Sequence, residues 1–267
     1  MEIIDTRLWI TTSDGVLFIY KALPGKRHRY IYRYMDLHDE WWWEPTTVVV
    51  GGQNDWTFFI GSDHVSEVVI TDDDTLEVSR HTHHSSGDVI ASAYDIQTDT
   101  LFFVTASANN DFLAFKLESG RLIRRTMQAD DKASITAVSA QGHIAFLRES
   151  GAFSIVQPFE NKNTHSVYMG DPHQIHTGYF AEFIVTDEGK TYFVYLGGRD
   201  SEITVARCTR GTWQMRTLLV ADTDVGYSDF SAFLDPGTDG QNLIVRVGPD
   251  RRPCFRREEN DLAMPSM

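Results

Sequence analysis

Residues 101–127 read LFFVTASANNDFLAFKLESGRLIRRTM, and this stretch decides the fold class. Three short runs of apolar and β-branched residues are separated by turns that carry Ser, Asn, Asp and Gly, as β-hairpins require. A fourth run, DVIASAYD at 88–95, precedes them and is rich in small residues. The stretch therefore predicts one antiparallel sheet of four consecutive strands.

The same pattern recurs along the chain. Runs like the one at 101 begin at residues 8, 56, 143, 191 and 242, with the sequences LWITT, WTFFI, HIAFL, TYFVYL and NLIVRV. The run that closes each repeat is the most polar and carries arginine in RYIYRYM, TLEVSRH, RLIRRTM and WQMRTLL. Charge on a strand discourages edge-to-edge pairing, so these runs suit the outer edge of each sheet. The small residues of the first run suit a crowded innermost position.

Four strands per repeat of about 40–50 residues, without helical periodicity, predict an all-β fold of the β-propeller type. We count six four-stranded blades from the recurring runs, with five and seven as alternatives. One blade cannot bury both of its faces alone, so adjacent blades must stack against one another. We expect a single domain over residues 1–257, closed into a ring by strands from both termini, and a frayed tail at 258–267. LWITT is either the innermost strand of the first blade or, with HDEWWWEP as a loop, a second strand.

Composition restricts the partners and the location. The formal net charge is −14 with a pI near 5.0, which favours a basic partner and argues against nucleic acid and anionic membranes. No secretory signal and no long apolar run is present, and two cysteines are too few for a disulfide scaffold. We therefore expect a cytoplasmic protein. Cys208 and Cys254 lie one repeat apart, on like strands of adjacent blades, which predicts free thiols.

In a propeller, the connections from each outer strand to the next inner strand lie on one rim. Here these connections span 36–45, 82–87, 128–133, 171–177 and 220–228, and they hold many of the acids and histidines. Functional residues concentrate in such loops on a rigid scaffold. The candidate binding residues are Asp36, His38, Asp39, Glu40, Trp41, Trp42, Trp43, Glu44, His83, His84, Asp130, Asp131, His173, His176, Asp222, Asp224 and Tyr227.

Three consecutive tryptophans, Trp41 to Trp43, have two interpretations. As an aromatic platform they would stack on a partner's side chains, cations or sugar rings. As part of a strand, alternation would turn Trp41 and Trp43 toward the neighbouring blade and leave Trp42 exposed. We expect the mixed outcome, with two rings buried and one presented.

The remaining polar groups favour no catalytic or metal chemistry. His81 and His83 could supply two zinc ligands, but no partner pair with a standard spacing exists, so we expect solvated loop histidines, no metal and no cofactor. Glu182 and Asp229 fall in inner-strand runs and could face an axial channel as acid and base. No nucleophile motif accompanies these carboxylates, and a hydrated channel wall is the simpler interpretation.

Three functions are therefore compared. The sequence favours a non-catalytic interaction module, a scaffold that binds a protein partner through the loop-rich rim. A glycan-binding, lectin-like propeller is the first alternative, although the tryptophan triplet has no counterpart in the other repeats. A hydrolase or lyase that uses Glu182 and Asp229 in the axial channel is the second alternative.

Overall fold

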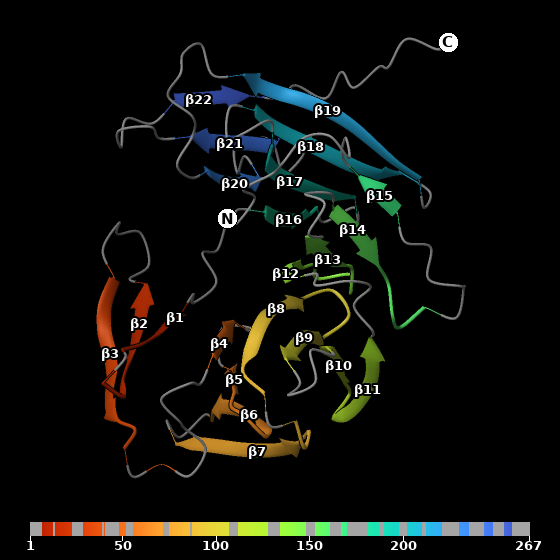
Figure 1. The fold of residues 1–267 in the computed structure, drawn as a ribbon. Coiled ribbons are helices and arrows are strands. Elements are labelled where there is room, and N and C mark those ends of the chain that lie inside the picture. Colours follow the sequence, from red (N-terminus) through yellow and green to blue (C-terminus); the bar gives the residue numbers. More distant parts are fainter. Residues whose placement is uncertain are drawn as a thin grey trace. The chain divides into compact units, whose positions relative to one another are not determined.

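The computed structural model shows an all-β protein built from antiparallel sheets (Figure 1), which confirms the all-β, antiparallel part of the prediction. The described residues are 7–12, 14–22, 29–38, 40, 48–51, 56–71, 75–85, 87–106, 112–127, 134–147, 153–160, 167–169, 181–186, 190–197, 202–209, 212–220, 230–234, 243–247 and 254–257. Within them, 22 strands form six sheets. The chain divides into two compact units, residues 1–128 and 129–267, and each unit is treated separately below.

The first unit holds three sheets, named A, B and C. Sheet A consists of β1 (Arg7–Thr11), β2 (Val16–Ala22) and β3 (Arg29–Asp36). Sheet B consists of β4 (Val48–Gly51), β5 (Trp56–Ile60), β6 (His64–Ile70) and β7 (Leu76–Thr82). Sheet C consists of β8 (Val89–Asp95), β9 (Thr100–Ala106), β10 (Phe112–Glu118) and β11 (Arg121–Met127).

The second unit holds sheets D, E and F. Sheet D consists of β12 (Ser134–Val138), β13 (Ile144–Leu147), β14 (Phe153–Val156) and β15 (Val167–Met169). Sheet E consists of β16 (Ala181–Val185), β17 (Thr191–Gly197), β18 (Glu202–Thr209) and β19 (Thr212–Val220). Sheet F consists of β20 (Phe230–Leu234), β21 (Leu243–Val247) and β22 (Cys254–Arg257).

Every sheet is a simple meander in which each strand pairs with the next strand along the chain. The β10–β11 hairpin shows the cause: Glu118 pairs with Arg121 across two residues, Ser119 and Gly120, whose φ angles are 49° and 71°. Two successive positive φ angles are the geometry of the two-residue turns whose twist matches that of antiparallel strands. The local turn residues thus determine which strands pair.

Strand β5 of sheet B is buried on both faces, which explains its nearly continuous apolar sequence. Adjacent side chains of a strand point to opposite faces. Phe58 therefore packs with Phe103 and Phe115 of sheet C, whereas its neighbour Phe59 packs with Leu17 of sheet A. Burying one phenylalanine side chain contributes roughly 1.5–3 kcal/mol. Stacking sheets face to face thus stabilises each sheet through its sequence neighbours.

In the second unit, sheets D and E pack in the same way. Ala145 and Ile155 of sheet D share a core with Phe193 and Tyr195 of sheet E. A short hydrogen bond, 2.6 Å from the Thr191 hydroxyl to the side-chain carbonyl oxygen of Gln141, also joins the two sheets. The first strands of successive sheets contact one another, β4 with β8 in one unit, and β12 with β16 and β16 with β20 in the other. Contacts between successive first strands are those expected of a radial array.

The first sheet corresponds to the last three strands of sheet B. After β3, the Leu37 N–H donates to the Gly15 carbonyl at 2.8 Å, and after β7, the His83 N–H donates to the Asp63 carbonyl at 2.8 Å. These equivalent bonds match β1, β2 and β3 with β5, β6 and β7. The correspondence favours the assignment in which LWITT is a second strand. Residues 41–47, with the three tryptophans, lie outside the described residues.

One face of sheet A is apolar yet exposed. Ile10, Phe18 and Tyr34 form one row across the three strands. The Phe18 and Tyr34 rings meet edge to face with centroids 5.4 Å apart. Ile10 is 40% exposed, Tyr34 is 64% exposed, and Ile31 on the same strand as Tyr34 is 52% exposed. The opposite face, which carries Leu17, packs against sheet B.

Candidate functional site

The candidate site lies at one end of sheets A and B. There, the β1–β2 turn of sheet A and the β5–β6 turn of sheet B each meet the segment that follows the outer strand, β3 or β7. In sheet B this turn contains Gly61, Ser62 and Asp63, and the chain leaving β7 contains His83. The N–H groups of His83 and His84 both donate to the Asp63 carbonyl, at 2.8 and 3.3 Å. These backbone bonds hold the connector against the turn.

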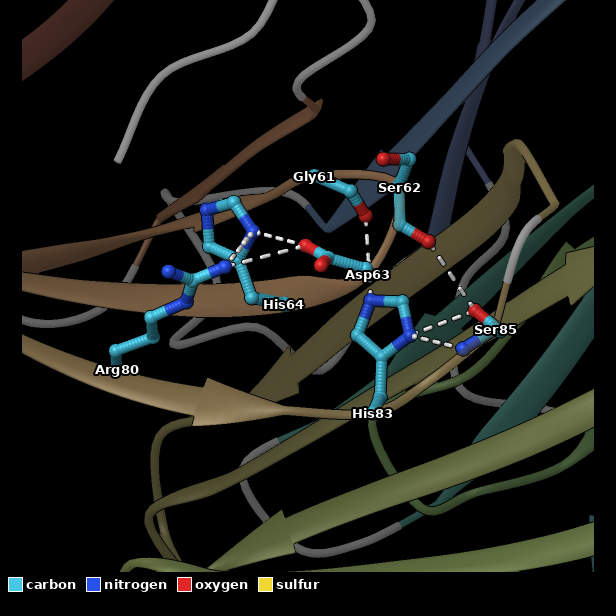
Figure 2. Close-up of polar contacts among 7 residues, drawn as sticks. All are labelled: Gly61, Ser62, Asp63, His64, Arg80, His83 and Ser85. Atoms are coloured by element: carbon cyan, nitrogen blue, oxygen red, sulfur yellow. Dashed lines mark hydrogen bonds and ion pairs between the residues drawn. The ribbon is translucent and has the colours of Figure 1, made fainter. Parts of the chain in front are cut away.

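The His83 side chain is a buried clamp (Figure 2), with 3% of the residue exposed. Its Nε2 lies 3.2 Å from the Gly61 carbonyl, and its Nδ1 lies 2.6 Å from the Ser85 hydroxyl and 3.3 Å from the Ser85 N–H. These partners fit a neutral ring that donates from Nε2 and accepts at Nδ1. Burial lowers the pKa of His83, which keeps the ring neutral.

Position 83 belongs to the core between sheets B and C. The His83 ring lies against Phe103 and Phe115, with centroids 5.4 and 5.1 Å apart. The equivalent position after β3 is Leu37, which is fully buried between sheets A and B. The interpretation of His83 as a solvated loop histidine is therefore wrong, because its position is one that requires a buried plug.

An acidic group sits beside this clamp. The Asp63 carboxylate accepts a hydrogen bond from His64 Nδ1 at 2.5 Å and lies 3.4 Å from the Arg80 guanidinium (Figure 2). The hydrogen bond from His64 is the largest cause that lowers the pKa of Asp63, so this carboxylate stays ionised at neutral pH. His64 is buried, whereas the Asp63 side chain is 51% exposed. The turn of sheet B thus carries a half-exposed carboxylate that is paired with Arg80.

Sheet A repeats the acidic feature. Asp36 Oδ1 accepts hydrogen bonds from the His38 N–H at 3.1 Å and from His38 Nδ1 at 2.6 Å, and both side chains are exposed. The side-chain bond from His38 lowers the pKa of Asp36. Asp14, on the β1–β2 turn, has its pKa lowered first by a hydrogen bond from the Thr12 side chain. The turns that precede β2 and β6 thus each carry a carboxylate whose pKa is lowered, Asp14 in sheet A and Asp63 in sheet B.

The structure places some of the predicted binding residues and not others. The predicted Asp36 and His38 lie near Asp14, which was not predicted, at the end of sheet A, and the exposed His84 follows the buried His83 at the end of sheet B. Glu40 donates its N–H to the Leu37 carbonyl and is half-buried. The predicted residues that lie outside the described ones are Asp39, Trp41, Trp42, Trp43, Glu44, Asp130, Asp131, His173, His176, Asp222, Asp224 and Tyr227.

Sequence reasoning did not predict four members of the site, Asp14, Asp63, His64 and Ser85. The available signal was the alignment of GSDH at 61–64 with TSDG at 12–15, since both follow an aromatic strand and both carry an acid. It also missed His143, which is 5% exposed between β12 and β13 and accepts from the Ser139 hydroxyl at Nδ1 (3.0 Å). His143 stacks on Phe183, so its role is structural.

The pairing of Ser85 with His83 has the composition of a nucleophile and its base, but its environment excludes that chemistry. Both residues are 3% exposed, and the second ring nitrogen of His83 donates to a backbone carbonyl. A substrate cannot reach a hydroxyl buried in this way. Within the described ranges, no group of three or more His, Cys, Asp or Glu side chains is placed to hold a metal ion.

The remaining residues singled out from the sequence are two carboxylates and two cysteines. Glu182 is on β16, the first strand of its sheet, and is half-buried, while Asp229 is outside the described residues. Cys208 lies on β18 and Cys254 on β22, which are the third strands of sheets E and F. The cysteines therefore occupy like strands of successive sheets, as the repeat predicts, and the free-thiol state stays a prediction.

No protein-family model matches the chain, and no curated protein matches its sequence. Solved structures do match. AofleA from Arthrobotrys oligospora is 10% identical with a TM-score of 0.50, and the match covers 96% of this chain and 83% of that one. The WD40 domain of SCAP from fission yeast is 10% identical with a TM-score of 0.51, and the match covers 91% of this chain and 64% of that one.

A post-proline cleaving enzyme from Rickettsia typhi is 8% identical with a TM-score of 0.51, and the match covers 95% of this chain but 43% of that one. Identities this low inform about the fold alone. WD40 domains are β-propellers, so the similarity is consistent with the propeller expected from the repeats. In the described part of the chain, no helix has the length and apolar character needed to cross a bilayer.

Proposed function

We propose that this chain is a non-catalytic interaction module that binds a basic protein partner through the rim formed by the outer-to-inner connections. One observation carries the proposal: Asp14, Asp36 and Asp63 lie at this rim with pKa values lowered by hydrogen bonds. Each carboxylate is therefore ionised at neutral pH and open to solvent. In a chain of net charge −14, such a rim steers and holds positively charged groups.

The scaffold for this rim is proposed to be a single β-propeller over residues 1–257. Its six sheets would form six blades, closed into a ring by strands from both termini, with residues 258–267 as a tail. The exposed apolar row of Ile10, Phe18 and Tyr34 supports closure, because an outer face of this kind needs a covering blade. Cross-linking of cysteines introduced at Ile10 and on β21 would test closure, and no cross-link under oxidising conditions would contradict it.

The tryptophans and the remaining acids of the rim extend the proposed surface. We keep Trp42 as a presented side chain whose replacement by alanine weakens partner binding by about 1–3 kcal/mol with little loss of stability. A Trp42→Ala chain that unfolds would show instead that the residue belongs to the core. A cytoplasmic location, with neither nucleic acid nor membrane as partner, remains part of the proposal.

The experiment compares two charge-matched variants. Asp36→Asn with Asp63→Asn removes two rim charges, and Glu77→Gln with Glu160→Gln removes two exposed charges elsewhere. Proteins captured by the wild-type chain from a cell extract are eluted with increasing salt and quantified. The proposal expects the rim variant to lose its captured partner at lower salt than the control variant, because close ionic contacts are screened. Equal retention by both variants would refute it.

A further inference from the structure

A second interaction surface, beyond the proposed rim, lies on the outer edge of sheet C. Its outermost strand, β11, pairs with β10 on one side and has no strand partner on the other side within the described residues (Figure 1). Because Glu118 and Arg121 close a two-residue turn, alternate residues from Arg121 onward exchange hydrogen bonds with β10. The N–H and C=O groups of Leu122, Arg124 and Thr126 therefore point outward.

The same strand carries three exposed arginines without acidic partners. Arg121, Arg124 and Arg125 are exposed, and no carboxylate among the described residues pairs with them. Other cations of these sheets are paired: Lys116 contacts Glu118 at 2.8 Å, and Arg80 contacts Asp63. In a chain with 38 acids and 24 bases, this strand is a local excess of positive charge.

The positions of the arginines fit an extended ligand better than a single anion. Alternation along the strand places Arg121 and Arg125 on one face of the sheet and Arg124 on the other. An added strand that carries acidic side chains on both of its faces would meet all three guanidinium groups. Its backbone would pair with the outward groups of Leu122, Arg124 and Thr126.

We propose that the β11 edge binds an extended acidic segment of a partner protein, which adds to sheet C as a fifth strand. Charged edge strands generally repel other sheet edges and prevent aggregation. Arginines select against neutral and basic edges, but they attract an acidic one, so the edge is selective for its partner. A polyphosphate backbone would use the charges alone and would leave the outward N–H and C=O groups of Leu122, Arg124 and Thr126 without strand pairing.

The experiment measures fluorescence anisotropy of a labelled ten-residue peptide that alternates glutamate and threonine, with the full chain, at low and physiological ionic strength. The wild-type chain should bind this peptide and not its lysine–threonine counterpart. R121Q/R124Q/R125Q should weaken binding on the order of tenfold, since each exposed charge pair contributes modestly. Lys190→Gln removes a cation of the second unit that belongs to neither proposed surface, so this control variant should leave binding unchanged.

A backbone probe separates strand addition from simple charge attraction. Thr126→Pro removes one outward N–H and keeps all three arginines. A glutamate–threonine peptide that is N-methylated at alternate residues tests backbone pairing with the wild-type chain, because it lacks the N–H groups that would pair with β11. Both changes should weaken binding, and circular dichroism confirms that each variant is folded.

Three results would overturn the proposal. The first is failure of the acidic peptide to bind the wild-type chain. The second is that the peptide binds the triple arginine variant as tightly as the wild type, or that the N-methylated peptide binds as tightly as the unmethylated peptide. The third is tighter binding of a ten-nucleotide oligothymidine than of the peptide. None of these results bears on the rim, because the Asp36 and Asp63 variants leave β11 intact.

Discussion

Acidification should destabilise the fold through His143, and the size of the effect can be calculated. Burial lowers the pKa of His143 from 6.5 to about 4, because the ring lies against Phe183 and Trp213 and loses the water that would stabilise its charged form. The unfolded chain therefore binds a proton at higher pH than the folded chain does. The contribution of the neutral His143 ring to stability is complete above pH 6.5 and is lost as the pH falls toward 4.

The difference between 6.5 and about 4 corresponds to roughly 3 kcal/mol when both states have titrated. Between pH 7 and pH 5 the loss from this one residue should be about 2 kcal/mol.

The assay is urea denaturation at pH 7 and pH 5 at constant ionic strength, for the wild type and His143→Gln. The variant should lose about 2 kcal/mol less on acidification than the wild type. His84→Asn is the control, since His84 is exposed at a positive φ of 51° that asparagine accepts. If His143→Gln and the wild type lose the same free energy, the histidine is not held neutral by burial and the reasoning fails.

Three other outcomes are expected. His83→Leu should lower the free energy of unfolding by roughly 1–3 kcal/mol, since the Gly61 carbonyl and the Ser85 hydroxyl lose their partner. Adding Ser85→Ala should restore part of this free energy. A leucine variant as stable as the wild type in urea denaturation would contradict the role of His83 as a clamp. Gly87→Ala should lower the free energy of unfolding by about 1–3 kcal/mol or more, because its Cβ would lie 1.5 Å from a backbone oxygen. Gly120→Ala, whose Cβ would meet open space, should lower it by about 1–2 kcal/mol from backbone strain alone. A lower urea midpoint for Gly120→Ala than for Gly87→Ala would contradict this ranking. Thiol titration of the chain unfolded without reductant should find both cysteines reduced, and a lower count would show a disulfide.

The strands could be predicted because their information is local. In 101–127 the turn residues and the alternation of apolar residues specify strand order and pairing together, and sheet C forms as expected. Residues that act through distant contacts could not be predicted in this way. Thr-His-His-Ser-Ser-Gly at 82–87 has the composition of a solvated loop, and only its alignment with Leu37 shows that position 83 fills a core.

The charged rim was partly predictable for the same reason. Acids in the connection at 36–45 were visible as composition, and Asp36 and His38 do lie together at the end of sheet A. The neighbouring Asp14 belongs to a short hairpin turn whose sequence is ordinary for a turn. Asp14 lies beside Asp36 because β3 ends next to the β1–β2 turn. This arrangement is a property of the three-stranded sheet and not of either segment alone.

Each four-stranded sheet in the described part of the chain is formed by one uninterrupted run of sequence, as in sheet C, whose four strands span residues 89–127. A nascent polypeptide can therefore pair all strands of one sheet soon after they leave the ribosome, with short loops and a small entropic cost of closure. Unpaired edges are then exposed for only a short time during synthesis. The order in which the chain is translated becomes the order in which the layers accumulate.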